Sequence, residues 1–575
     1  MSIPRPRGNP NRRDDTGSSG HPDRAGTPGL GQLSRRQLLA GALGAGLAIS
    51  AGGLLTACGT GPQAGSIIAS GNGVAALPGD RPVRGGTFTA GVITAGSEEN
   101  LFPGTSAGNP DMARCYNLYN FLFYPNSGPN LYPVVPGLAV SAEPSKSATV
   151  WTLKLRDGVT WHDGKPFTAS DVVYNFTHLW GNAAANYSSG FLVGLVDFKN
   201  VRALDRLTVQ IPLLAPASEL PSILGLFNFG VLQEGATLQS TAANPIGTGP
   251  FKFESFTPGQ QSVFVANKDY WEEGKPYVDR LVIDSTFTDD TALLNALVSG
   301  SINLLISPTL TQAREQVGAR QVQVLQSPSA TQTYMFGMRV DSGPFADNRV
   351  RLGFKLLVDR QVMIDGALAG FGQVANDLVG PYDPYYASDL KRSQDIDHAK
   401  ALFKAAGVIG KTFDWPTANV FPGMVESATI LASQAQAAGI NINVQPGSPG
   451  TYFTSADGAY VRYASQNVMQ PSASLTANYR ALLTVGAPYA DTWWGLQRPG
   501  GAQANALIAR AIGATSASSA QSLWRAAQLA QFNEGGYVVW GDLPYIDMAA
   551  RNVRGLKASG GLNFNLFRFC DGWLA

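Results

Sequence analysis

A stretch of thirty residues in the first third of the chain changes its hydrophobic period halfway along. It reads WTLKLRDGVTWHDGKPFTASDVVYNFTHLW, residues 151–180. Trp151, Leu153 and Leu155 alternate with polar residues, a pattern that is typical of a half-buried strand. Asp157-Gly158 is a favoured hairpin turn, so we predict a hairpin over residues 150–161. This segment alone excludes an all-helical fold.

The second half of the same stretch has the period of a helix. Thr168 is placed to cap the first turn, and Asp171 stands three residues later, which completes a capping box. The apolar positions then recur at helical spacing, at Val172, Phe176 and Leu179 or Trp180, so they predict one buried face. The turn HDGK joins the two halves. A chain that contains such a segment must combine strands with helices.

The same mixture continues from about residue 85 to the end of the chain, without strict alternation and without an internal repeat. The sequence GGTFTAGV, which begins at Gly85, predicts the first strand. Residues 348–368, NRVRLGFKLLVDRQVMIDGAL, predict one amphipathic helix. A chain of 575 residues is too long for one hydrophobic core. We therefore expect an α/β or α+β protein with several lobes.

The first 57 residues have the pattern of an export signal. Arg35 and Arg36 precede an uncharged, Gly- and Ala-rich run over residues 38–57, and this twin-arginine start is typical of Tat signals. The run ends LTAC, and it resembles a bacterial lipobox in which Cys58 is lipidated. An uncleaved membrane anchor is the alternative, and both interpretations place the body outside the cytoplasm. Residues 58–84 are predicted to form a flexible tether.

Charge gives no reason to expect a nucleic-acid partner. The formal net charge is +1, but seven of the 42 basic residues and only three of the 41 acidic residues lie within residues 1–37. The rest of the chain therefore carries slightly more acidic than basic side chains. It also has no basic cluster, whereas nucleic-acid binding depends on one.

The body of the chain holds two cysteines, Cys115 and Cys570, one near each end. An exported pair can form a disulfide. The alternative is two unpaired buried thiols, and sequence alone leaves both open because it does not give their separation.

Two short patterns suggest catalysis, and each has a simpler explanation. His162, Asp163 and Lys165 are crowded together in WHDGK, but Asp-Gly more often forms a turn. GTSAG, with Ser106 at its centre, matches the nucleophile elbow of hydrolases. Pro103 argues against the strand that such an elbow needs in front of it. Few histidines and no closely spaced His or Cys pairs are present, so we expect no metal site and no cofactor.

Four blocks of the sequence together resemble one known family. They are WTLKLRDGVTWHDGKPFTASDVVYNF, NPIGTGPFKF with NKDYW after it, PFADNRVRLGFKLLVDRQVMI and DHAKALFKAAG. Their order and spacing are similar to those of the extracytoplasmic solute-binding proteins of ABC importers, in family 5, which includes dipeptide, oligopeptide and nickel binders.

The resemblance implies an α/β fold of the periplasmic-binding-protein type, a clam-shell of two lobes (class II) with an extra domain inserted in the first lobe. Ligand is then bound between the lobes, which close by hinge bending. The implied boundaries are lobe I over residues 85–120, 246–338 and 535–575, the inserted subdomain over 121–245 and lobe II over 339–534. This layout puts Cys115 and Cys570 in the same lobe, where a bridge is plausible.

The resemblance also implies where the ligand contacts lie, because solute pockets combine aromatic walls with a few polar groups. An early loop, the last strand before lobe II, the centre of lobe II and the C-terminal crossover line the cleft in this family. The corresponding candidates are Glu98, Glu99, Asn100, Tyr334, Phe336, Asn467, Trp493, Trp494, Tyr545 and Asp547. Each has a structural alternative; Trp493 and Trp494, for example, are also typical of a loop anchored in the core.

One candidate departs from the family pattern. Peptide binders of this family hold the α-ammonium of the peptide with an Asp in lobe II, and Asn467 aligns with that position. An amide accepts a hydrogen bond but does not neutralise an ammonium in a closed cleft. A peptide with a free amine then needs another carboxylate, such as Glu98.

The sequence therefore predicts a monomeric, lipid-anchored solute receptor on the outer face of the cytoplasmic membrane. It would take a peptide or a peptide-sized organic solute, deliver it to the permease subunits of an ABC importer, and carry out no catalysis. Two alternatives stay open at this point. One is a secreted hydrolase that uses Ser106 or a carboxylate pair, and the other is a clam-shell receptor without a permease.

Overall fold

A computed structural model gives the structure of the chain. It describes residues 81–106, 108–126, 134–182, 184–186, 188–448, 452, 458–471, 474–483, 501–559 and 563–575. All of these belong to one compact unit that spans residues 66–575. Within them, no helix has both the length and the apolar character needed to cross a membrane. The predicted signal segment, residues 1–57, and Cys58 lie outside the described residues, as do Trp493 and Trp494.

The largest sheet of the described part has nine strands and mixes parallel with antiparallel pairs. Its order is β16-β12-β17-β11-β1-β10-β9-β8, and β13 pairs with β17 beside this path. β1 runs parallel to both β10 and β11, whereas the other pairs are antiparallel. The strands are β1 (Thr87–Ile93), β8 (Phe251–Phe256), β9 (Gln261–Ala266), β10 (Arg280–Phe287), β11 (Leu304–Ile306), β12 (Val322–Met338), β13 (Gln373–Val374), β16 (Ser465–Pro471) and β17 (Tyr537–Ala550).

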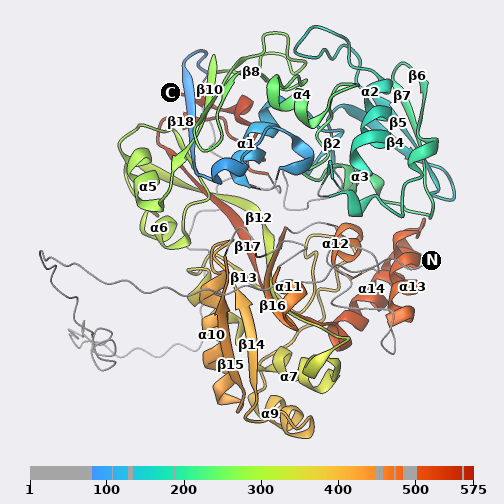
Figure 1. Cartoon of the computed structure of the whole chain (residues 1–575), viewed down its shortest axis with the longest axis vertical. Coiled ribbons are helices and arrows are strands. Elements are labelled where there is room, and N and C mark those ends of the chain that lie inside the picture. Colours follow the sequence, from blue (N-terminus) through green and yellow to red (C-terminus); the bar gives the residue numbers. More distant parts are fainter. Residues whose placement is uncertain are drawn as a thin grey trace, which may run out of the picture. The chain divides into compact units, whose positions relative to one another are not determined.

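β12 and β17 are much longer than their neighbours and run side by side (Figure 1). At one end of the pair, β17 is hydrogen-bonded to β11. At the other end, β12 is hydrogen-bonded to β16. The register between β12 and β17 shifts near Gln326, Ala330 and Tyr334, so the ladder is interrupted around its middle. These two strands thus join the first part of the sheet to the segment that contains β16.

A separate sheet of four strands, in the order β4-β5-β7-β6, contains the motif that opened the sequence analysis. The strands are β4 (Ala139–Pro144), β5 (Val150–Leu155), β6 (Arg202–Asp205) and β7 (Thr208–Pro212). Trp151, Leu153 and Leu155 are buried on one face, as the alternation predicts.

The predicted hairpin over residues 150–161 is wrong. β5 pairs with β4 and β7, not with the residues after Asp157-Gly158. Residues 159–161 turn away and bond instead to residues 165–167, since Trp161 N donates to Lys165 O and Phe167 N donates to Val159 O. The reversal therefore occurs at HDGK. Alternation identified the strand, but it could not identify the partner.

The capping box is confirmed. Thr168 N donates to Asp171 Oδ2 at 2.9 Å, and Thr168 caps α2 (Ala169–Tyr174). A π-helical turn over Asn175–Trp180 continues that helix. Val172, Phe176, Leu179 and Trp180 are all buried, which confirms the predicted face.

The remaining strands form two-stranded pairs, and the helices surround the sheets. The pairs are β2 (Phe123–Tyr124) with β3 (Val135–Pro136), β14 (Thr412–Thr417) with β15 (Asn441–Pro446), and β18 (Val553–Arg554) with β19 (Trp573–Leu574). The helices besides α2 are α1 (Asn109–Leu118), α3 (Leu220–Leu224), α4 (Leu238–Ala243), α5 (Asp290–Val298), α6 (Leu310–Glu315), α7 (Asn348–Leu357), α8 (Arg360–Ala367), α9 (Ile396–Ala405), α10 (Met424–Ala437), α11 (Ala459–Arg462), α12 (Leu475–Leu482), α13 (Gly501–Ile512) and α14 (Ala517–Glu534).

The single helix predicted over residues 348–368 is two helices, α7 and α8. The break falls at Val358, which has the extended angles φ −73° and ψ 117°. Asp359 then caps α8, because its side chain accepts a hydrogen bond from Val362 N. The helical spacing of apolar residues continues through the break. It therefore predicted one helix, although Asp359 is a typical N-cap residue.

Candidate functional site

The early loop with Glu98, Glu99 and Asn100 is tied to the interior by one buried arginine. Arg114 on α1 is fully buried and its Nη2 lies 2.6 Å from Glu99 Oε2. Asn100 N and Nδ2 donate to Asp111, which is also paired with Arg114. Glu98 is exposed, and its carboxylate accepts a hydrogen bond from Ser97 Oγ at 3.4 Å. The three neighbours thus have different roles in the fold, and a ligand contact stays a prediction for each.

The electrostatics of Glu99 follow from this network. Burial raises the pKa of its carboxyl, but the Arg114 charge and hydrogen bonds from Ala95 N and Ser285 Oγ outweigh burial, so the pKa lies below its usual value. Glu99 is therefore a stable carboxylate whose oxygens already have partners inside the protein.

Tyr334 and Phe336 on β12 lie in the core that packs against α7, α8 and α10. Both are fully buried, and their rings contact Trp540 on β17 at centroid distances of 5.4 and 6.0 Å. Among the residues that the structure describes, none forms a hydrogen bond with the Tyr334 hydroxyl. Phe336 also contacts Trp415, which makes it a core residue.

Tyr545 and Asp547 lie on β17, near the point where its register with β12 shifts. Tyr545 is half-buried and its N donates to Ser327 Oγ. Asp547 is buried and accepts hydrogen bonds from Ser307 N and Phe564 N, both at 3.0 Å. Burial raises the pKa of Asp547 to about 6 although these bonds lower it. Asp547 therefore fastens two loops, and Tyr545 is the more open of the pair.

Asn467 on β16 is fully buried, and its amide is directed into the protein. Asn467 Nδ2 donates to the Met424 carbonyl and, at 2.9 Å, to Ser427 Oγ. These bonds connect β16 to the start of α10. A contact between Asn467 and the ligand stays a prediction. The buried position of the side chain argues against such a contact.

Both cysteines of the body are buried free thiols in this structure, so it contains no bridge between Cys115 and Cys570. Burial raises the pKa of both thiols, that of Cys570 to about 12. Such thiols are protonated at neutral pH and oxidise slowly.

The WHDGK motif, next to the four-stranded sheet, is hydrogen-bonded to the GTGP loop, residues 247–250. His162 Nδ1 accepts a hydrogen bond from Gly247 N at 3.2 Å, His162 Nε2 lies 3.0 Å from Gly249 O, and the His162 backbone N donates to Gly247 O. The imidazole is thus neutral, with its proton on Nε2. Two of the four sequence blocks therefore contact each other directly.

This arrangement makes part of the stability depend on pH. Burial lowers the pKa of His162 to about 4, whereas an unfolded histidine titrates near 6.5. The folded state thus favours neutral imidazole. The contribution of neutral His162 to the free energy of unfolding is complete above pH 6.5 and is lost as the pH falls towards 4. We expect urea denaturation to show that His162→Asn costs up to about 3 kcal/mol at pH 7 and much less at pH 4.

His398→Asn is the matched control for this measurement, because His398 is an exposed residue at the start of α9. A stability difference between His162→Asn and the wild type that stays constant from pH 7 to pH 4 would contradict the structural role of the neutral imidazole.

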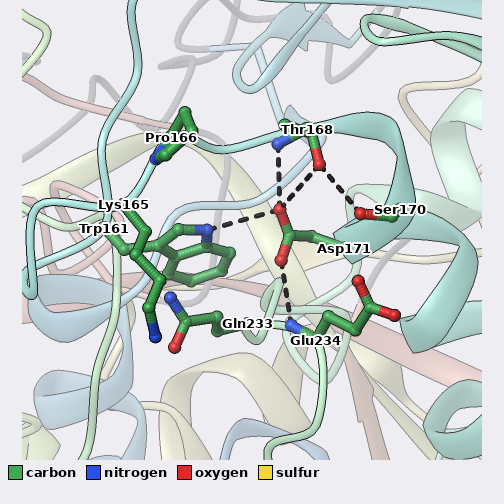
Figure 2. A pocket seen from close by; sticks show the side chains of 8 residues that line it. All are labelled: Trp161, Lys165, Pro166, Thr168, Ser170, Asp171, Gln233 and Glu234. Atoms are coloured by element: carbon green, nitrogen blue, oxygen red, sulfur yellow. Dashed lines mark hydrogen bonds between the residues drawn. The ribbon is translucent and has the colours of Figure 1, made fainter.

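A cavity of about 320 Å³ lies beside the same motif, and Figure 2 shows its wall. The carboxylate at its centre, Asp171, is already bonded to Thr168 N, Trp161 Nε1 and Glu234 N, at 2.9, 3.3 and 2.9 Å. Among the other polar side chains, Lys165, Ser170 and Glu234 are exposed, and Thr168 and Gln233 are half-buried. The cavity therefore borders a helix cap and offers no unused buried polar group.

Ser106 does not have the geometry of a nucleophile elbow. It is 1 % exposed and follows a short 3-10 helix, Pro103–Thr105, instead of a strand. In the part of the chain that the structure describes, its hydroxyl has no hydrogen bond to a histidine. Likewise, no group of three or more His, Cys, Asp or Glu in that part is arranged to hold a metal ion.

Sequence reasoning missed two neighbouring acids beside α3 and α12, the half-buried Glu219 and the buried Asp383, and a separate buried acid on β17. Glu219 precedes α3, Asp383 lies in the loop PYDPYY, and Asp542 is on β17. Burial raises the pKa of Glu219 and of Asp542 to about 7, and it also raises that of Asp383. One signal was present: an Asp stands inside the apolar run YVVWGDLPYI. The other two acids have no distinctive sequence context.

Comparison with known proteins identifies the family. The model described as "Bacterial extracellular solute-binding proteins, family 5 Middle" matches residues 133–482, more than half of the chain. The chain belongs to family 5 of the bacterial extracellular solute-binding proteins. Membership confirms the expectation of a binding protein and overturns the hydrolase alternative, which the buried Ser106 also disfavours.

Curated relatives and solved structures agree with the family. The chain is 32 % identical over 286 residues to the nickel-binding periplasmic protein of Escherichia coli, and 28 % identical over 300 residues to its dipeptide-binding protein. Each match covers 48 % of this chain and 53 % or 55 % of the relative, so the chain spans about half the length of these relatives.

The fold match extends further than the sequence match. The periplasmic binding protein DppA from Helicobacter pylori, solved with the peptide STSA, superposes with a TM-score of 0.71 at 20 % identity, over 86 % of this chain and 99 % of that one. This confirms the expected α/β fold of a periplasmic binding protein. The separate sheet β4-β5-β7-β6 is consistent with the expected inserted domain.

Proposed function

We propose that the protein is the solute-binding component of an ABC importer for peptides or peptide-sized organic solutes. The family match over residues 133–482 carries the proposal. The similarity to a dipeptide-binding protein and to a structure solved with a bound peptide supports this choice of solute.

The same proposal includes the layout and the location of the protein. Lobe I is formed by residues 85–120, 246–338 and 535–575, the inserted subdomain by 121–245, and lobe II by 339–534. The long strands β12 and β17 support this division, because both pass between the sheet regions of the two lobes. The solute binds between the lobes of a monomer, and membrane permease subunits receive it.

The twin arginines, the uncharged run and the LTAC ending support export and attachment by lipid at Cys58 to the outer face of the cytoplasmic membrane.

Thermal denaturation of the purified protein tests the proposed function. We expect a pool of di- to pentapeptides to raise the melting temperature, because a ligand at a hundredfold excess over its Kd stabilises the folded state by about 2.7 kcal/mol. Sugars and nickel–histidine complexes form the comparison arms. A protein that responds to one of these arms and to no peptide would contradict the choice of peptides.

A further inference from the structure

Some acids that are shielded from solvent have a cationic partner in this protein, and others do not. Asp377 is paired with Arg360 and Arg392, just as Glu99 is paired with Arg114. Within the described residues, no Lys, Arg or His side chain forms an ion pair with any of the following: Glu219, Asp383 and Asp542. A carboxyl that is shielded from solvent and has no counter-charge is costly, so the neighbouring pair Glu219 and Asp383 requires an explanation.

The fold holds two of these acids together through a pair of serines. Ser222 Oγ donates to Glu219 O at 2.7 Å and lies 3.3 Å from Ser474 Oγ. Ser474 caps α12, and Leu475 N in the first turn of that helix donates to Asp383 Oδ2 at 2.8 Å. Residues far apart in the sequence, in the proposed inserted subdomain and in proposed lobe II, thus bring Glu219 and Asp383 to one place.

Polar atoms at this place still lack partners. Glu219 Oε2 is shielded from solvent and accepts no hydrogen bond from the described part of the chain. Tyr479, one turn along α12, is fully buried, interacts electrostatically with Asp383, and its hydroxyl has no hydrogen bond. Tyr385 adds a ring next to both acids. Carboxylates beside aromatic rings form an environment that suits an ammonium group.

We propose that Glu219 and Asp383 bind a protonated amine of the solute, and that Tyr479 lines the same subsite. This inference rests on the proposed function and narrows its substrate class to solutes that carry an amine. The amine would supply the counter-charge that the protein does not, and it would donate to Glu219 Oε2. This subsite would also supply the carboxylate that a free amine needs. Asn467 cannot supply it, because its side chain is an amide that bonds to Met424 and Ser427.

Isothermal titration with two matched peptide pools tests the subsite. The first pool contains tripeptides without lysine and with free amino termini, and the second contains the same tripeptides after N-acetylation. We expect the full-length protein to bind the first pool, and Glu219→Gln and Asp383→Asn each to weaken this binding by about ten- to a hundredfold, as for loss of a charged hydrogen bond. Asp397→Asn, which alters an exposed acid in the first turn of α9, is the control and should bind like the wild type.

The outcomes separate the inference from the proposed function. Equal binding of both pools by the wild type, or unchanged affinity in both acid variants, would overturn the subsite and leave the importer function intact. Binding of neither pool would count against the choice of peptides as well. Thermal denaturation of both variants shows whether they fold. If Glu219 and Asp383 only hold two segments together, the variants will change in melting temperature while their affinity for free-amine peptides stays the same, and this result also refutes the subsite.

Discussion

Gly247→Ala is expected to leave little folded protein. The added Cβ would lie 1.8 Å from Leu118 O and 2.7 Å from Leu118 C, both backbone atoms at the end of α1. Neither atom belongs to a flexible side chain, so the loop has to move away from the helix. The movement would also break the hydrogen bonds between Gly247 and His162. We expect a loss of more than about 4 kcal/mol, in the severe range for a point substitution.

Soluble yield and urea denaturation measure this effect. Gly225→Ala is the matched control, because its nearest neighbour, Val134 Cγ1, would be at an ordinary 3.5 Å and its φ of −86° suits alanine. The control should stay within about 0.5 kcal/mol of the wild type. A Gly247→Ala protein with a normal yield and a normal urea midpoint would show that the GTGP loop does not pack against α1 as described.

Arg114→Met is expected to destabilise the protein by about 3–5 kcal/mol, the usual cost of removing one partner from a buried ion pair. Methionine fills much of the volume but leaves Glu99 without its counter-charge, and it removes the donors to Ser262 and Ser285, which lie 2.5 and 2.8 Å from the guanidinium. Glu99 would then become easier to protonate, so the variant should be relatively less impaired at low pH.

A double-mutant cycle with Glu99→Gln isolates the pair, since the loss from the double variant should be clearly smaller than the sum of the two single losses. Arg206→Met is the control, because the Arg206–Asp157 pair is exposed and its loss should leave the urea midpoint close to that of the wild type. Additive losses in the cycle would refute the coupling between Arg114 and Glu99.

Local patterns in the sequence predicted local structure well. Thr168 and Asp171 are three residues apart, and a capping box depends on nothing beyond that spacing, so it was correctly identified. Pairing between strands depends on residues elsewhere in the chain. The partner of β5 was therefore mispredicted, although its buried face was correct. The family resemblance depends on the order of four sequence blocks along the chain. It therefore predicted the fold, which the alternation of β5 and the capping box of α2 did not.

The candidate site was harder to predict for a similar physical reason. Asn467 and Phe336 are paired across β16 and β12, and both are directed into the core, which no single-strand pattern reveals. Glu219 and Asp383 are 164 positions apart, and they meet only because Ser222 and Ser474 bring α3 to α12. An acid in a loop is usually solvated, so no local pattern predicted that these two carboxyl groups would be shielded from solvent.

The interrupted ladder between β12 and β17 has a mechanical consequence. Two paired strands that connect the same two regions resist twisting and shearing, because either motion would stretch one strand relative to the other. Bending is easier where the register shifts near Gln326 and Ala330, since fewer ladder hydrogen bonds are strained there. The pair therefore leaves mainly one rotational degree of freedom between the regions that it joins. For the proposed closing motion, such a constraint would keep the loss of entropy small and would return the same surface geometry in each cycle.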